Sequence, residues 1–103
     1  MSQPRITYPG ACVLQAVARG CRYGFDIMDF AGLPSGTVYP ILRRYEALGL
    51  LRSDWEETDN AHAKGRPRRR NYELTLDGEA ALQRAAERFA LHQRIFAPEE
   101  AQG

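Results

Sequence analysis

The 103-residue sequence has few of the residues that build disulfide scaffolds, metal centres or catalytic sites. It contains two cysteines, Cys12 and Cys21, and two histidines, His62 and His92, and these four residues match no zinc-binding spacing. The sequence also lacks a glycine-rich phosphate loop after a strand and a Ser or Cys nucleophile in a sharp turn motif. We therefore expect no metal, no cofactor and no enzymatic activity.

Long apolar runs are absent as well. No stretch approaches the roughly 18 uninterrupted apolar residues of a membrane-spanning helix, and the first five residues are not followed by the apolar segment of a secretory signal. We expect a cytoplasmic protein with no membrane partner. In a reducing compartment, Cys12 and Cys21 are interpreted as small buried hydrophobic residues, with a redox switch as the alternative.

An excess of charge of one sign is missing too, since 14 Lys and Arg oppose 13 Asp and Glu. The signs nevertheless separate locally, because acidic residues within 54–59 are followed by a cation run without an acid. Such a run repels itself unless a polyanion neutralises it, so it favours a DNA-contacting arm, and Gly65 and Pro67 make the arm extended rather than helical. The alternative is an ordinary charged loop partly neutralised by residues 54–59. The candidate DNA contacts in this run are Lys64, Arg66, Arg68 and Arg69, with Arg70 at its end.

Apolar periodicity predicts three helices in the first half of the chain, over residues 9–19, 25–30 and 35–48. The third helix has the clearest pattern, and a C-terminal glycine, Gly49, follows it. We expect Ser35, Gly36 or Thr37 to cap this helix, which would place Pro40 in the first turn; a kink at Pro40 is the alternative. Its apolar stripe consists of Val38, Ile41, Leu42, Tyr45 and Leu48.

Two strands and a long helix are predicted next. Residues 50–56 and 70–75 alternate as strands of an antiparallel hairpin, joined by a polar loop, and Thr75 then caps a helix that ends at about Phe96. The fold is mainly α with a small β-hairpin, in the order α-α-α-β-β-α of a winged helix-turn-helix. We divide the chain into a DNA-binding domain (1–75), a C-terminal dimerisation helix (76–97) and a flexible tail (98–103).

In this fold residues 35–48 form the recognition helix, which enters the major groove of DNA. Near its start, Ser35, Thr37 and Tyr39 would approach phosphates and base edges. Arg43 would reach a phosphate or a guanine, and Arg44 the DNA backbone. The alternative is a solvated helix face that carries two arginines.

The terminal helix carries more apolar surface than a small domain covers alone. We expect a two-fold homodimer through this helix, whose two recognition helices lie about 34 Å apart and read an inverted repeat in double-stranded DNA. The alternative is packing on its own domain only. Trp55 is interpreted first as a core residue and second as a ring at the dimer cleft, where Trp55 and Phe89 would bind a small-molecule effector. The predicted dimerisation residues are Leu82, Ala85, Ala86, Phe89 and Phe96.

Several motifs together resemble the PadR family of bacterial transcriptional regulators, over a region from about Tyr8 to Leu82. They are Tyr23-Gly24-Phe25-Asp26-Ile27, Ser35-Gly36-Thr37-Val38-Tyr39-Pro40-Ile41-Leu42 and Gly65-Arg66-Pro67-Arg68-Arg69-Arg70-Asn71-Tyr72-Glu73-Leu74-Thr75. The resemblance implies a winged-helix repressor, dimeric through its C-terminal helix, that leaves its operator when a small effector binds. It also implies that Pro40 belongs inside the recognition helix. The DNA contacts that it implies are Ser35, Thr37, Tyr39, Arg43, Arg44, Lys64, Arg66 and Arg68.

Two other functions are alternatives. A winged helix can serve as a protein-interaction module without DNA binding, in which case the cationic wing would meet an acidic partner. A small-molecule-binding or catalytic protein would instead use a polar-lined pocket, and the dimer cleft beside Trp55 and Phe89 is the candidate place for it.

Overall fold

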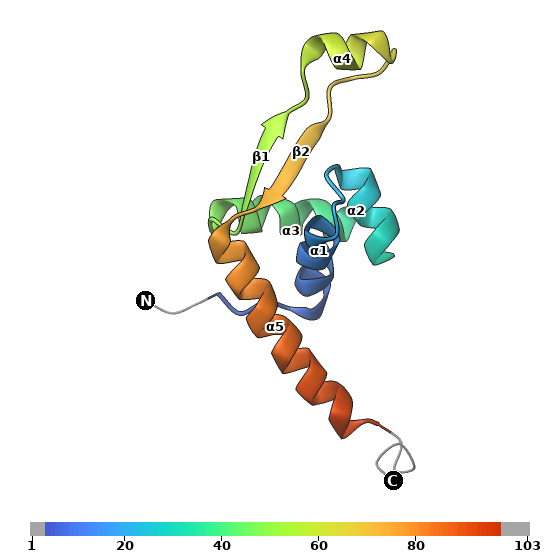
Figure 1. The fold of residues 1–103 in the computed structure, drawn as a ribbon. Helices are drawn as coiled ribbons and strands as arrows, with labels where there is room; N and C mark the ends of the chain where they lie inside the picture. The colour runs from blue at the N-terminus through green and yellow to red at the C-terminus, as the bar shows by residue number, and fades with distance from the viewer. Residues whose placement is uncertain (1–3, 98–103) are drawn as a thin grey trace.

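The computed structural model describes residues 4–97 and has the element order of a winged helix-turn-helix with a long C-terminal helix (Figure 1). The predicted helices and strands are confirmed to within one or two residues at their ends. The predicted tail over 98–103 lies outside the described residues. The elements are α1 (Tyr8–Ala18), α2 (Gly24–Ala31), α3 (Ser35–Ala47), β1 (Leu51–Trp55), α4 (Thr58–Ala63), β2 (Arg70–Leu74) and α5 (Leu76–Ile95).

Helix α1 lies at the centre of the hydrophobic core. It packs against α2, α3, β2 and α5, so it meets the other three long helices and the second strand directly. Most residues of the core are apolar positions predicted from helical and strand periodicity. The placement of Leu48 in the buried stripe of α3 is wrong, because it lies at the C-cap, where the helix ends, and is 45% exposed. The largest fully buried side chains are Val13, Leu14, Ile27, Val38, Leu42 and Leu51.

The N-cap of α3 lies one residue before the earliest of its three expected positions. Pro34 occupies the N-cap position without a side-chain hydrogen bond, so the prediction that Ser35, Gly36 or Thr37 caps the helix is wrong. A proline is suited to this position because its fixed φ favours the extended backbone that enters a helix. Pro40 therefore lies within the helix, as the family resemblance implies, and leaves the carbonyl group of Gly36 without its usual intrahelical donor.

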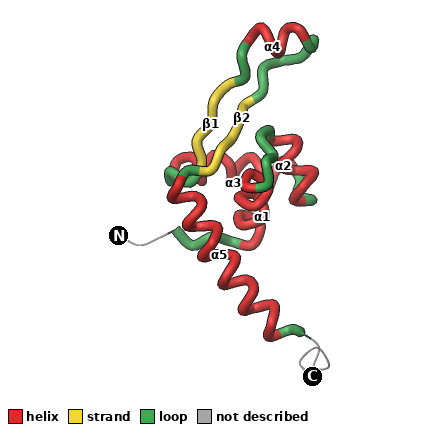
Figure 2. The backbone as a smooth tube through the Cα atoms, in the orientation of Figure 1, coloured by secondary structure: helices red, strands yellow, loops and turns green. Residues whose placement is uncertain are grey.

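The two strands form an antiparallel hairpin that projects from the helical body (Figures 1 and 2). Its register pairs Leu51 with Leu74, Ser53 with Tyr72 and Trp55 with Arg70. Leu51 and Tyr72 are buried at the base of the hairpin, whereas its outer end leads into α4. The hairpin with α4 and the loop that follows, residues 51–74, is called the wing below.

Helix α4 was not predicted from the sequence. The sequence prediction of an extended polar loop between the strands is wrong over this segment. The short helix spans Thr58–Ala63 and buries Ala61. Its formation has local causes, since Asp59 lies in the first turn, where a negative charge is favourable, and two alanines have high helix propensity. The tip of the wing is therefore folded rather than extended.

Helix α5 begins at Thr75 as predicted. The Thr75 hydroxyl accepts a hydrogen bond from the Gly78 amide at 3.0 Å and donates one to the Gly49 carbonyl at 2.6 Å, which fixes the helix to the turn after α3. The first half of α5 packs on the core through Ala81 and Ala85, and the second half extends away from it (Figure 2). In the described residues, no helix combines the length and apolar character that crossing a lipid bilayer requires.

Candidate nucleic-acid interface

The turn between α2 and α3 presents one face of α3 to solvent. Helix α2 ends at Gly32, whose left-handed φ of 67° lets the chain reverse within three residues before α3 starts. The inner face of α3 is buried through Val38, Leu42 and Tyr45. The predicted recognition residues lie on the outer face: Ser35, Tyr39, Arg43 and Arg44 are exposed, and Thr37 is half-buried.

Tyr39 also holds α2 and α3 together. A Cβ atom built on Gly24 would lie 2.7 Å from two carbons of the Tyr39 ring, so the ring needs a glycine at the start of α2. This close packing leaves Tyr39 partly exposed and fixes its side chain. The Tyr-Gly motif of the sequence therefore has a structural role in positioning a predicted DNA contact.

The recognition helix is joined to the wing by a network of three polar side chains. The Ser53 hydroxyl donates to the Glu46 carboxylate at 2.5 Å, and Arg70 donates from Nε to Ser53 Oγ at 2.8 Å and from Nη2 to Glu46 Oε2 at 3.3 Å. Glu46 belongs to α3, whereas Ser53 and Arg70 belong to the two strands. The network fixes the two strands of the wing relative to the outer face of α3.

The tip of the wing is built around Glu56, which exposes 8% of its surface. Its carboxylate accepts hydrogen bonds from Arg66 Nη1 and Nη2 at 2.5 and 2.8 Å, from the Asn60 side-chain amide at 2.7 Å and from the Arg69 backbone amide at 3.3 Å. The hydrogen bonds from Arg66 lower the pKa of Glu56 to about 2, against the opposing effect of burial. Arg66, a predicted DNA contact, is thus paired within the wing with Glu56, one of the acidic residues within 54–59.

The remaining arginines of the cation run have different partners. The Arg69 guanidinium lies 3.7 Å from the ring centroid of Tyr23, so Arg69 joins the wing to the segment before α2. Arg68 donates from Nε to the backbone carbonyl of Glu56 at 2.8 Å and is otherwise exposed. Lys64 is exposed at the end of α4. The predicted contacts in this run are therefore of two kinds, with Arg66 and Arg69 engaged inside the chain and Lys64 and Arg68 directed to solvent.

Trp55 is a surface residue. It is 54% exposed at the outer end of β1, and the guanidinium groups of Arg68 and Arg70 lie 5.7 and 5.3 Å from its ring centroid. The interpretation of Trp55 as a core residue is wrong because the strand projects beyond the helical body, where no apolar layer covers it. Sequence alternation alone does not reveal how far a strand extends past its core.

Helix α5 carries the residues predicted for dimerisation, and they differ in exposure. Ala86 and Phe96 are exposed, while Leu82 and Phe89 are half-buried against the core of the same chain. The expectation that Ala85 faces a partner is wrong, because it is 1% exposed and packs in the core of its own chain.

Two large exposed side chains of α5, Leu91 and Ile95, were missed in the sequence prediction. With Phe96 they form an apolar surface on the last turns of the helix, called the α5 end below. Their spacing from each other, four residues, is the helical signal in the sequence that could have identified them. The α5 end leaves apolar area in water unless another surface covers it.

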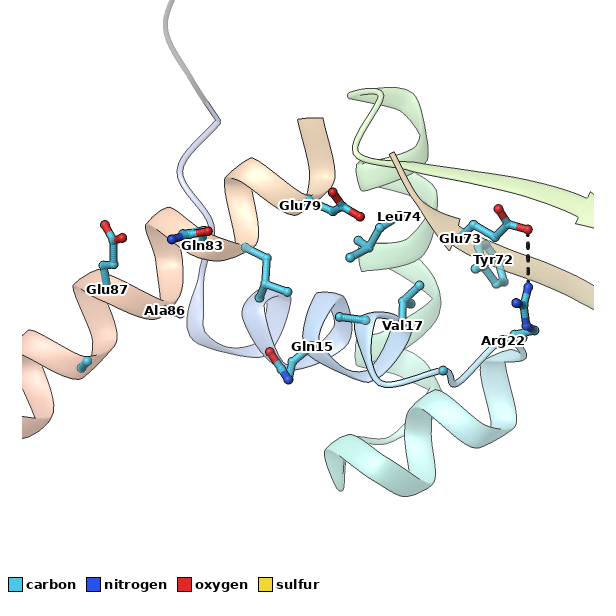
Figure 3. A pocket seen from close by; sticks show the side chains of 14 residues that line it. Gln15, Val17, Arg22, Tyr72, Glu73, Leu74, Glu79, Gln83, Ala86 and Glu87 are labelled. Atoms are coloured by element: carbon cyan, nitrogen blue, oxygen red, sulfur yellow. Dashed lines mark hydrogen bonds and ion pairs between the residues drawn. The ribbon is translucent and has the colours of Figure 1, made fainter. Parts of the chain in front are cut away.

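A cavity of about 700 Å³ lies between the end of α1, strand β2 and the middle of α5 (Figure 3). Its wall combines apolar side chains such as Val17 and Leu74 with charged ones, including the Arg22–Glu73 pair at 3.4 Å. A smaller cavity of about 270 Å³ is lined by Phe89. Trp55 lines neither of these two cavities.

Cys12 and Cys21 are both free and half-buried. Burial raises the pKa of the Cys21 thiol, and the nearby carboxylates of Asp26 and Asp29 raise it further. The reactive thiolate of Cys21 is therefore disfavoured, which agrees with a packing role. Within residues 4–97, no three His, Cys, Asp or Glu side chains are grouped so that they could hold a metal ion.

Residues 13–84 match the family described as the transcriptional regulator PadR-like family. No curated protein matches the chain. Among solved structures, a PadR family transcription regulator from hypervirulent Clostridium difficile R20291 has a TM-score of 0.74 at 20% identity and covers 94% of this chain and 100% of that one. A PadR-like transcription factor from Bacteroides fragilis has a TM-score of 0.63 at 28% identity, with 84% of each chain covered.

A transcriptional regulator whose name does not mention the PadR family has the same fold. PcaV from Streptomyces coelicolor, solved in complex with its natural ligand, has a TM-score of 0.77 at 22% identity, and the similarity covers 95% of this chain and 67% of that one.

Proposed function

This chain belongs to the PadR-like family of transcriptional regulators, and we propose that it is a homodimeric, sequence-specific DNA-binding repressor that a small effector releases from its operator. The observation that carries the proposal is the exposed outer face of α3, which is fixed to a cationic wing by the bonds from Ser53 and Arg70 to Glu46. Two rigidly related elements of this kind can contact one duplex at adjacent grooves.

In this proposal residues 1–75 form the DNA-binding domain. Arg43 contacts a base edge or phosphate from the major groove, and Arg44 contacts the backbone. Ser35, Thr37 and Tyr39 lie at the start of α3, where a helix favours phosphate oxygens. Of the wing residues predicted as DNA contacts, Lys64 and Arg68 are the exposed cations that remain for phosphate contacts.

Dimerisation through residues 76–97 is proposed from the exposure of α5. Ile95 and Phe96 are 71% and 85% exposed, and Leu91 lies on the same end of the helix. A second copy of α5, related by a two-fold axis, would cover these side chains with an identical apolar surface. The pair of recognition helices would then read an inverted repeat.

The effector site is proposed to be the 700 Å³ cavity rather than a cleft that contains Trp55. Its volume lies within the range of small-molecule sites, about 300–1,000 Å³, and its mixed apolar and charged wall suits a small polar molecule with an apolar body. The cavity is bounded by α5 and by β2, so a ligand there would contact both the dimerisation helix and the wing. That arrangement offers a physical route for release from DNA.

The experiment that tests the proposal is selection of bound duplexes from a random pool, followed by fluorescence anisotropy with the enriched duplex and a shuffled one. We expect the enriched duplex to bind at least about 10³-fold more tightly, and both affinities to fall as salt rises from about 50 to 200 mM. A protein-interaction module predicts no enrichment and no affinity for duplex DNA. That result would reject the proposed function.

A further inference from the structure

The wing carries an exposed aromatic ring, that of Trp55, on a surface where polar side chains are the usual residues. Trp55 is the single tryptophan of the chain, and more than half of it is exposed. A large aromatic surface in water is unfavourable, and exposed tryptophans are enriched at binding surfaces. Because α3 is the proposed recognition helix, the position of this ring relative to α3 bears on whether the ring meets the same partner.

Strand register places Trp55 on the side of the hairpin that faces α3. Residues at alternate positions share a face, so Trp55 lies on the same face as Ser53 and its cross-strand neighbour Arg70. Both of these bond to Glu46 of α3. Trp55 is the outermost residue of β1 on this face, so its ring extends the surface of the recognition helix toward the tip of the wing.

Two guanidinium groups are held beside the ring by other bonds. Arg68 is anchored by its bond to the Glu56 carbonyl, and Arg70 is anchored by Ser53 and Glu46. Each anchored arginine keeps further N–H donors for an additional partner, because a guanidinium has five. The side chains of both arginines are accessible to solvent.

We propose that Trp55, Arg68 and Arg70 form the duplex-contacting surface of the wing, in which the indole packs against a deoxyribose and the two guanidinium groups bind the flanking phosphates. This inference rests on the proposed function, which it extends to the wing. The alternation of phosphate and sugar along a DNA strand matches the alternation of cation, aromatic ring and cation on the wing. Contacts to sugar and phosphate position a protein on DNA without reading the sequence.

The assignment also separates the wing arginines by role. Arg66 is held by Glu56 and Arg69 by Tyr23, so these two build the wing. The contact to DNA on this face of the wing then belongs to Arg68 and Arg70 of the cation run, rather than to Arg66 and Arg69.

The test uses Trp55 as its own probe, since its emission is the only tryptophan signal. Acrylamide quenching of the wild-type protein is measured free and with the enriched and shuffled duplexes. Anisotropy with both duplexes is measured for Trp55→Ala, Trp55→Phe and, as a control, Arg52→Ala. Arg52 is an exposed cation on the opposite face of the same strand, where it pairs with Glu73 at 3.1 Å.

We expect both duplexes to protect Trp55 from acrylamide. Trp55→Ala should weaken binding to both by the same factor, about three- to tenfold, as loss of one aromatic contact predicts. Trp55→Phe should retain most of the affinity, and Arg52→Ala should bind as the wild type does.

Binding of the wild type with unchanged acrylamide quenching, together with full affinity of Trp55→Ala, would overturn this inference and leave the proposed function in place. A loss confined to the enriched duplex would also overturn it, because the ring would then read a base. Failure of the wild type to bind either duplex would instead reject the proposed function on which the inference rests.

Discussion

Both terminal nitrogens of Arg66 donate to the carboxylate of Glu56, a residue ten positions earlier in the chain, at 2.5 and 2.8 Å. This pair closes the tip of the wing, because Glu56 follows β1 and Arg66 follows α4. The same carboxylate accepts bonds from the Asn60 side chain and the Arg69 backbone amide. Glu56 is therefore the organising residue of the wing, and its charge is needed for that role.

The wing should lose its order in acid. The pKa of Glu56 is lowered from 4.5 to about 2, chiefly by the hydrogen bonds from Arg66, so the folded wing favours the charged form. A depressed folded-state pKa contributes stability that is present above pH 4.5 and is lost as the pH falls toward 2. Trp55 emission should follow this change, since Arg68, which borders its ring, donates to the backbone carbonyl of Glu56 and would shift as the wing loosens around that residue.

The measurement is a titration of Trp55 emission from pH 7 to about 2, with Glu56→Gln as the control. The variant should show a wing that is already loosened at neutral pH and no further transition assigned to this residue. An identical titration of wild type and variant would contradict the role of Glu56.

The helical body could be predicted from the sequence because its signals are local. The apolar stripe of α3 with Gly49 after it, and Thr75 with acidic residues in the turn that follows, are patterns within a few residues of one another. The cap of α3 was missed because Pro34, which has no capping side chain, occupies a place where Ser and Thr are the usual residues.

The wing could be predicted only in outline, because its bonds join residues far apart in the sequence. The cation run lies between the two strands, as the sequence predicts. The partners of Arg66 and Arg69 could not be predicted, because they depend on how the loop folds back on Glu56 and Tyr23. The exposure of Trp55 and the burial of Ala85 likewise follow from where the core ends, which periodicity does not specify.

Gly78→Ala should destabilise the fold by about 1–3 kcal/mol, the usual cost of overpacking. A Cβ atom at this position would overlap the backbone carbonyl of Leu50, which cannot move without shifting the turn after α3. Gly36→Ala is the matched control, because that helical position faces open space and alanine there should be neutral or stabilising. Urea unfolding measures both free energies; equal stability of the two variants would contradict the close approach of α5 to this turn.

Arg43→Ala should weaken binding to the enriched duplex by about 1–3 kcal/mol if the side chain contacts a base, with a much smaller effect on a shuffled duplex. Arg44→Ala should weaken both duplexes alike, because a backbone contact carries no sequence information. Anisotropy titrations at one salt concentration compare the four affinities. Equal losses on both duplexes for Arg43→Ala would refute its role in base recognition.

Ile95→Asp should convert the proposed dimer to monomers, because the charge would be placed in an apolar interface formed by the α5 end. Leu76→Asp is the control, since Leu76 is 83% exposed at the opposite end of the same helix and an acid near a helix N-terminus is favourable. Light scattering after size-exclusion chromatography gives the mass of each. A monomeric wild type, or a dimeric Ile95→Asp, would contradict dimerisation through this surface.

Binding of DNA by a dimer with two recognition helices is tested most directly by a hydroxyl-radical footprint of the wild-type protein on the enriched duplex. Two copies joined through α5 should protect two segments whose centres lie about 10 base pairs apart, one helical turn, with inverted sequence. A single protected segment, or uniform cleavage along the duplex at saturating protein, would contradict a dimer that presents two recognition helices to DNA.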